Sequence, residues 1–200
     1  MQAGGSAYAM PPFLAKAVGP VDKKAALTRQ TSLVAPNAVV VSVPKARLSL
    51  AATGVHGAWT RHRHGATRRT SFGDETVLFA KGVTEEFLTV RKHHGDHTWS
   101  WKLDTHGARP RVGVDGGVSL RAGHTLLPLA VKPVEILDAK GRNVTPRGLR
   151  WTVVHEDGSW WLRLRLNDKK LSVPYVIDPA IKHRVSRTSN NGTNGLPTVA

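Results

Sequence analysis

Histidines are the side chains whose spacing first suggests chemistry. The run from Lys92 to His97 places three imidazoles and one carboxylate close together, and His62 and His64 add two more imidazoles. Zinc and copper accept such ligands. The run lies between two strand-like segments, and no separated group of matching spacing completes a ligand set. The pattern therefore favours a polar turn, and we expect no metal and no other cofactor.

Motifs for covalent catalysis are missing from the sequence. The chain has no cysteine, no Gly-x-Ser-x-Gly elbow, no Ser-x-x-Lys in a helical pattern and no glycine-rich phosphate loop. Most carboxylates fall in expected turns, where Asp and Glu are common. The sequence does not measure whether two of them have the separation that a glycosidase needs. We expect no catalytic residues and no enzyme activity.

Tryptophans offer two opposed interpretations. Trp161 alternates with Arg163 and Arg165 along a strand-like segment, which places all three on its polar face. There an indole can stack on a sugar, lie under a guanidinium or pack against a neighbouring domain. We expect packing for most of the other tryptophans, because they share strand faces with leucines. The predicted core tryptophans are Trp99, Trp101 and Trp160.

Four arginines form the densest basic cluster, with two histidines and no aromatic residue among them. Single-strand nucleic-acid binding normally combines such charge with stacking aromatics. The cluster therefore predicts salt-sensitive adhesion to polyanions, without specific nucleic-acid recognition. Its members are Arg61, Arg63, Arg68 and Arg69.

Net charge is unevenly distributed along the 200 residues. The chain has 29 Lys and Arg against 14 Asp and Glu, for a formal charge of +15. Residues 1–70 hold ten basic side chains and one acidic one, whereas residues 71–181 hold sixteen and thirteen. The most regularly patterned part of the chain is thus close to neutral, so the excess charge belongs to basic arms.

Short strands and turns must position these side chains. Residues 97–103 alternate strictly between apolar and polar side chains, and residues 150–166 read as two strands joined by Glu156-Asp157-Gly158-Ser159. Strands recur about every ten residues, without a long helical pattern. We predict an all-β fold, an antiparallel β-sandwich or barrel-like module with poorly ordered basic N-terminal and C-terminal arms. Apolar runs are too short to span a bilayer.

Composition predicts three segments. Residues 1–32 are rich in Ala, Gly and Pro and are expected to be weakly ordered. Residues 33–181 form the expected β-rich domain. Residues 182–200 have the composition of a linker, or of the start of a following β-repeat.

The second half of the chain resembles the N-terminal β-rich module of large secreted bacterial surface proteins, which include precursors of Rhs-type and Ig-like repeat proteins. The resemblance covers about residues 70–195 and ends in a strand that reads Pro-Tyr-Val-Ile-Asp-Pro. It implies a scaffold or presentation role at the cell surface, with further β-domains following. The segments that carry it are residues 70–77, 82–90, 101–105, 114–118, 134–142 and 174–181.

These observations predict a non-catalytic structural or adhesive β-module of a secreted or cell-surface bacterial protein. Its expected partners are neighbouring β-domains of the same polypeptide. The alternative is a module that binds polyanions, such as anionic cell-wall polymers, or carbohydrate, through the basic arm and exposed aromatics such as Trp161.

Overall fold

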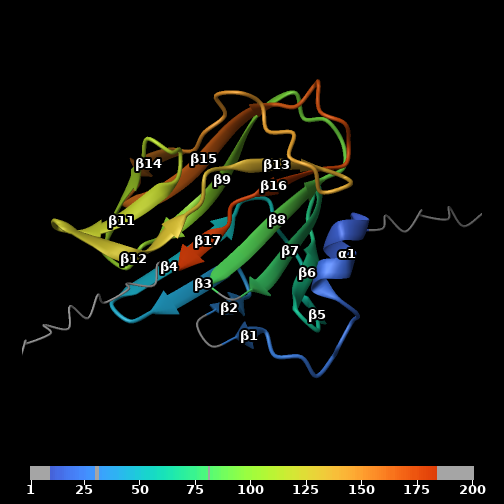
Figure 1. The fold of residues 1–200 in the computed structure, drawn as a ribbon, viewed down its shortest axis with the longest axis horizontal. Coiled ribbons are helices and arrows are strands. Elements are labelled where there is room, and N and C mark those ends of the chain that lie inside the picture. Colours follow the sequence, from blue (N-terminus) through green and yellow to red (C-terminus); the bar gives the residue numbers. More distant parts are fainter. Residues whose placement is uncertain (1–9, 30–31, 81, 184–200) are drawn as a thin grey trace, which may run out of the picture.

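Two antiparallel sheets packed face to face make up most of the protein (Figure 1). The structure is a computed structural model that describes residues 10–29, 32–80 and 82–183. The expected all-β sandwich is confirmed. Within the described residues, no helix is long and apolar enough to cross a membrane.

The strands of each sheet follow a fixed spatial order. The seven-stranded sheet runs β1 (Thr28–Arg29), β2 (Ser32–Ala35), β3 (Ala38–Val43), β4 (Ala46–Ala52), β9 (Asp96–Asp104), β15 (Ser159–Asn167) and β14 (Thr152–Glu156). The ten-stranded sheet runs β10 (Arg109–Val112), β11 (Val118–Ala122), β12 (Thr125–Val131), β17 (Ile181–His183), β8 (Val83–Val90), β7 (Gly73–Ala80), β6 (Gly65–Arg69) and β5 (Thr60–His62). Its remaining strands are β16 (Tyr175–Asp178), which pairs with β8, and β13 (Glu135–Asp138), which pairs with β16.

Alternating side chains on β9 and β15 fill the space between the sheets. Trp101 lies opposite Leu162 in the strand register, and Trp99 lies opposite Leu164. All four side chains are buried. The expected core positions of Trp99 and Trp101 are therefore confirmed. The indoles of Trp101 and Trp151 meet edge to face, with ring centroids 5.4 Å apart.

The hairpin between β14 and β15 has the predicted turn. Glu156 and Ser159 form its last pair, and Asp157 and Gly158 between them both have positive φ angles, of 49° and 71°. A two-residue turn with this backbone matches the twist of the flanking strands.

Helix α1 (Pro12–Val18) is the clearest departure from the sequence prediction, which expected residues 1–32 to be weakly ordered. Its buried Leu14 and Val18 pack on the outer face of the ten-stranded sheet, against Leu78, Phe87 and Val176. A proline in the first turn suits a helix start, because its missing N–H would have no partner there. At the other end of the domain, β17 crosses the predicted boundary at residue 181. Residues 184–200 lie outside the described residues.

Candidate functional site

The four clustered arginines do not share one surface. Arg61, Arg63 and Arg69 are exposed, but Arg68 is only 4% exposed and points between the sheets. The Nε atom of Arg69 lies 3.6 Å from Asp74 Oδ1. The prediction that Arg68 binds a surface polyanion conflicts with this burial, because alternation along β6 places Arg68 on the same inward face as the buried Ala66.

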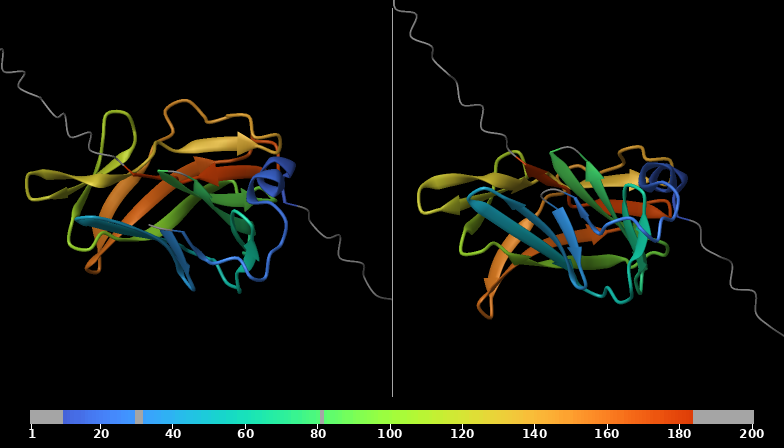
Figure 2. Two further views of the ribbon diagram at one scale, coloured as in Figure 1. Left: turned by 60° about the horizontal axis from the view of Figure 1, so that its bottom comes forward. Right: turned by 90° about the horizontal axis from the view of Figure 1, so that it is seen from below.

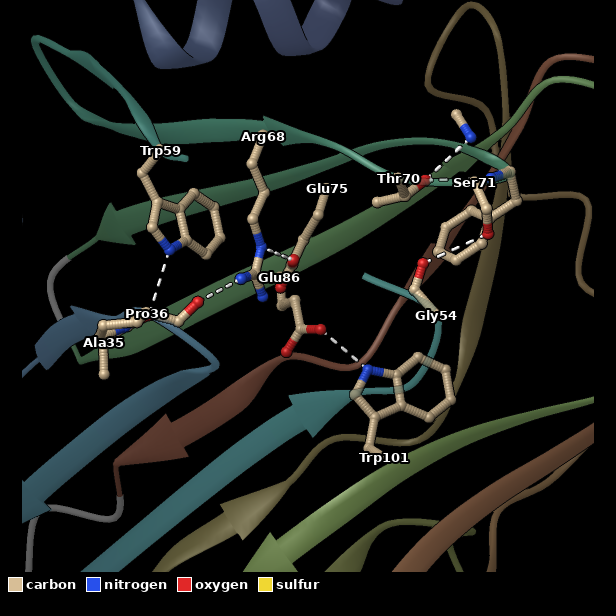
Figure 3. A network of polar contacts seen from close by, with 12 residues as sticks. Ala35, Pro36, Gly54, Trp59, Arg68, Thr70, Ser71, Glu75, Glu86 and Trp101 are labelled. Carbon is tan, nitrogen blue, oxygen red and sulfur yellow. Dashed lines mark hydrogen bonds and ion pairs between the residues drawn. The ribbon is translucent and has the colours of Figure 1, made fainter. Parts of the chain in front are cut away.

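Arg68 is held by three partners (Figure 3). Its Nε donates to Glu75 Oε2 at 2.5 Å, and one terminal nitrogen donates to the Pro36 carbonyl at 2.6 Å. The guanidinium carbon lies 4.1 Å from the centroid of the Trp59 ring, a cation–π distance. The Trp59 indole in turn donates to the Ala35 carbonyl at 3.1 Å. The β2–β3 turn and the loop before β5 are thereby joined to β6 and β7.

A second carboxyl, that of Glu86, lies next to Glu75 inside the sandwich. Glu86 accepts a hydrogen bond from the Trp101 indole at 2.8 Å, and its other oxygen has no partner among the described residues. Burial, and then the neighbouring Glu75 charge, raises the pKa of Glu86 well above its usual value. Burial also raises the pKa of Glu75, although Arg68 opposes that shift. Neither glutamate lines the two surface pockets described below.

Exposed positive charge gathers instead along the edge of β5. The chain that follows α1 runs beside this strand: Asp22 N donates to Arg61 O, and Arg63 N donates to Pro20 O, each at 3.1 Å. His62 is buried behind this contact. Its ring nitrogens lie 3.1 Å from Gly19 O and 2.9 Å from Thr67 Oγ1.

This contact brings together basic residues from two parts of the sequence. Asp22 is the single carboxylate between residues 10 and 69, and its Oδ1 accepts from the Lys24 backbone amide at 2.9 Å. The exposed cations outnumber it, and their electrostatic potentials add at this edge. We call this set the basic edge; its members are Lys16, Lys23, Lys24, Arg61 and Arg63. The sequence prediction named the two arginines and did not place the three lysines beside them.

The predicted face of Trp161, Arg163 and Arg165 exists on the outside of the seven-stranded sheet. Both arginines are ion-paired there. Arg163 forms two bonds with Glu156, at 2.9 and 2.5 Å, and Arg165 forms two with Asp96, at 3.0 and 2.6 Å. The two carboxylates compensate much of the positive charge of this face. Trp161 is half-buried beside them.

The histidine run forms a packed loop. Asp168 accepts from the amides of His94 and Gly95, both at 2.8 Å, and from the Tyr175 hydroxyl at 2.9 Å. The rings of His94, His97 and Trp99 pack with centroids 4.7 to 5.3 Å apart. Burial lowers the pKa of His94. In the described part of the chain, no three His, Cys, Asp or Glu side chains are arranged to hold a metal ion.

An open pocket of about 830 Å³ lies where β9 and β15 approach β10. Trp160 and His155 line it, with ring centroids 4.5 Å apart. Trp160 was expected to fill the core, but it is only half-buried, because it packs on the core and also lines this pocket. Polar side chains surround the rings. They are Lys102, Asp104, Thr105, Arg109, His155 and Ser159.

Sequence reasoning did not find this pocket. Its residues come from three segments that meet only when β9 pairs with β15 and β10 approaches β14. The one local signal was the Trp160-Trp161 pair, which must point to opposite faces of a strand. No family model, no curated protein and no solved structure matches this chain.

Proposed function

We propose that this chain is a non-catalytic structural and adhesive β-module of a secreted or cell-surface bacterial protein, and that it adheres to anionic polymers through the basic edge. The observation that carries the adhesive part is the set of five exposed cations at β5, on the segment hydrogen-bonded to it and on α1, with Asp22 as the one carboxylate between residues 10 and 69. The resemblance of residues 70–195 to surface-protein modules supports the location and a role beside further β-domains.

Rigid placement favours adhesion at this edge. Backbone hydrogen bonds fix residues 18–22 against residues 61–64, so the lysines and arginines are held near one another before a ligand arrives. Binding a flexible anionic chain then releases the counterions of that chain. This release makes the binding free energy more favourable for any sequence of the polymer, and its contribution falls as the salt concentration rises. Anionic cell-wall polymers provide that repeated charge.

The test measures binding of the full chain to purified polyglycerol-phosphate wall polymer by fluorescence anisotropy, from about 50 to 300 mM NaCl. We expect affinity to fall steeply with salt. Replacing Lys23, Lys24, Arg61 and Arg63 together by Gln should weaken binding by roughly tenfold or more at low salt and flatten the salt dependence.

A matched control removes the same number of exposed cations elsewhere. The residues Lys140, Arg147, Arg150 and Lys170 are exposed and lie outside the basic edge. Their replacement by Gln should leave most of the affinity intact. Equal losses in the two variants would show that net charge alone matters, and the proposal of a basic edge would be wrong.

A second candidate function is carbohydrate binding in the Trp160 pocket. An exposed aromatic wall ringed by carboxylate, hydroxyl and basic groups is the combination that binds a sugar, through stacking and through hydrogen bonds. Trp160→Ala and Asp104→Asn should then abolish binding of a neutral glycan at high salt. Trp161→Ala, on the other face of the same strand, should not. Retained glycan binding in both pocket variants would reject this candidate.

A further inference from the structure

A second pocket, of about 580 Å³, lies on the outer face of the ten-stranded sheet. Its lining includes residues of β11 and β12, whose hairpins extend from the body at the end opposite to α1 in both views of Figure 2. It shares no residue with the Trp160 pocket or the basic edge. Its volume is within the range of small-molecule sites.

The strand register builds the floor of this pocket. Val83 pairs with Lys182, Lys182 pairs with Ala130, and Ala130 pairs with Ser119. These four residues therefore form one row across β8, β17, β12 and β11, and all of them line the pocket. Cross-strand neighbours in one row point to the same face of a sheet, so the row is a continuous surface.

Apolar side chains line much of the pocket, and some of them are exposed to solvent. Leu126 is 42% exposed, and Val114, in the turn before β11, is fully exposed. Val83 is half-buried. Exposed apolar groups beside a concave surface are typical of a binding site, since covering them removes apolar area from water.

Three cations surround this apolar surface. Arg121 and Lys132 are half-buried, and Lys182 is exposed. Arg121 is oriented by a bond from one terminal nitrogen to the His124 carbonyl, at 3.0 Å. The single carboxylate in the lining is that of Asp115, and its Oδ1 accepts from the Gly117 amide at 3.1 Å. The lining is thus both apolar and cationic.

Acidic residues also act on Lys132 from outside the lining. Asp178 is buried and interacts with Lys132, Glu85 and Glu135. Burial raises the pKa of Asp178 to about 8, so this carboxyl is mostly uncharged at neutral pH. Asp178 therefore adds little negative charge beside Lys132 near neutral pH, and Glu85 and Glu135 are the other carboxylates of this group.

We propose that this pocket binds a small amphiphilic anion, a monomeric carboxylate on an aliphatic chain. The carboxylate lies between Lys132 and Lys182, which are diagonal neighbours across β12 and β17, and the aliphatic chain runs over Ala130 toward Leu126. Charge complementarity selects the head group, and the apolar surface favours an aliphatic tail. The site goes beyond the proposed adhesive function and does not depend on it.

The test titrates decanoate, below its micelle concentration, into the full chain by isothermal calorimetry. Decanol and butyrate serve as probes that lack the charge or the long chain. We expect decanoate to bind, and both other probes to bind at least about tenfold more weakly, since each loses one of the two contacts. Equal binding of decanol would overturn the proposal.

Variants locate the binding. Lys132→Gln combined with Lys182→Gln should weaken decanoate binding by about tenfold or more, because hydrogen bonds to a charged group are strong. Leu126→Gln should also weaken decanoate binding, because it removes an apolar contact with the aliphatic tail. The control, Lys140→Gln combined with Lys170→Gln, removes two exposed lysines elsewhere and should have no effect. Unchanged urea midpoints would show that each variant folds, and unchanged decanoate affinity in the first two would reject the site.

A bilayer is the competing occupant, since Val114 and Leu126 are exposed beside cations. Vesicles of phosphatidylglycerol and phosphatidylcholine test it by co-sedimentation. We expect monomeric decanoate to bind in the absence of vesicles. Binding to vesicles with no binding of monomeric decanoate would replace the small-molecule site by a membrane contact.

Discussion

The space between the two sheets has two parts with different chemistry. Around β9 and β15 it is filled by indoles and branched aliphatic chains, such as Trp151, Leu162 and Leu164. Around β6, β7 and β8 it holds Arg68, Glu75 and Glu86. Trp101 belongs to both parts: its ring packs on Trp151 and its N–H reaches Glu86 (Figure 3).

The two parts stabilise the fold in different ways. In the apolar part, stability grows with the area removed from water and is independent of pH. In the polar part, removing charges from water is costly, and the cost is offset only while every partner is present. The apolar part should therefore tolerate gradual change, whereas the polar part should fail abruptly when the Arg68–Glu75 pair is broken. Three predictions test this contrast, and a fourth concerns a buried carboxyl outside the space between the sheets.

The largest effect is expected for Arg68→Met. This change leaves two carboxyls buried without their cation, and the loss should be about 3–5 kcal/mol of unfolding free energy at pH 7. Urea denaturation measures it. Arg165→Met breaks an exposed ion pair and should leave the urea midpoint almost unchanged. Equal urea midpoints for the two variants would show that the buried Arg68 ion pair contributes no more to stability than the exposed Arg165 pair.

Leu164→Ala tests the apolar part. It removes a fully buried side chain that faces Trp99 across the strand pair, and should cost about 2–4 kcal/mol. The loss should be the same at pH 5 and pH 8, because no titrating group is changed. A loss that varied strongly with pH would show that the two parts of the core are coupled.

Glu86→Gln should stabilise the protein, whereas the two changes above destabilise it, and the gain in unfolding free energy should grow with pH. Because the pKa of Glu86 is raised in the folded protein, its contribution to stability is present below its unfolded pKa and is lost as pH rises through the folded pKa. The variant should match the wild type near pH 4.5 and become relatively more stable toward pH 8. Thermal unfolding across this pH range measures the difference.

Glu75→Gln is the matched control for that variant. It removes the carboxylate that pairs with Arg68, so it should destabilise the protein at neutral pH. A gain in stability from Glu75→Gln and a loss from Glu86→Gln would reverse the assigned roles of the two glutamates.

The last prediction, Asp178→Asn, concerns a buried carboxyl outside the space between the sheets. Burial raises the pKa of Asp178 from 3.8 to about 8, so its contribution is lost between about pH 4 and pH 8 as pH rises. The variant should lack that part of the pH dependence, as seen by thermal unfolding. An unchanged curve would mean that Asp178 titrates normally.

Local patterning predicted the regular part of the fold. Alternation identified β9 and β15, and the Asp157-Gly158 pair identified the turn of the hairpin between β14 and β15. Helix α1 was not predicted, since seven residues are too few for a clear helical period and the segment is rich in Ala, Gly and Pro. Its stability comes from contacts with residues more than sixty positions away.

The site predictions failed where long-range pairing decides exposure. A basic run such as residues 60–70 reads as a solvated loop, yet one residue in it, Arg68, meets Glu75 across a hairpin and Pro36 from the other sheet. The useful signal was that Glu75 alternates with Val77 and Phe79 on β7, and Glu86 with Leu88 and Val90 on β8, so each glutamate shares a strand face with apolar residues. The pocket above β12 and β17 had no local signal, because its floor combines the β11–β12 hairpin with β8 and β17, which are distant in the chain.

The segment after α1 also decides how this sandwich meets other strands. β5 ends the ten-stranded sheet, and an open sheet end invites main-chain pairing with another protein, which leads to aggregation or strand exchange. Here the amide of Arg63 and the carbonyl of Arg61 are already bonded to residues 20 and 22. A strand of another protein would therefore find these two main-chain groups already bonded at this end. Contact here would fall to the exposed side chains of the basic edge, which salt weakens, and would not extend the sheet.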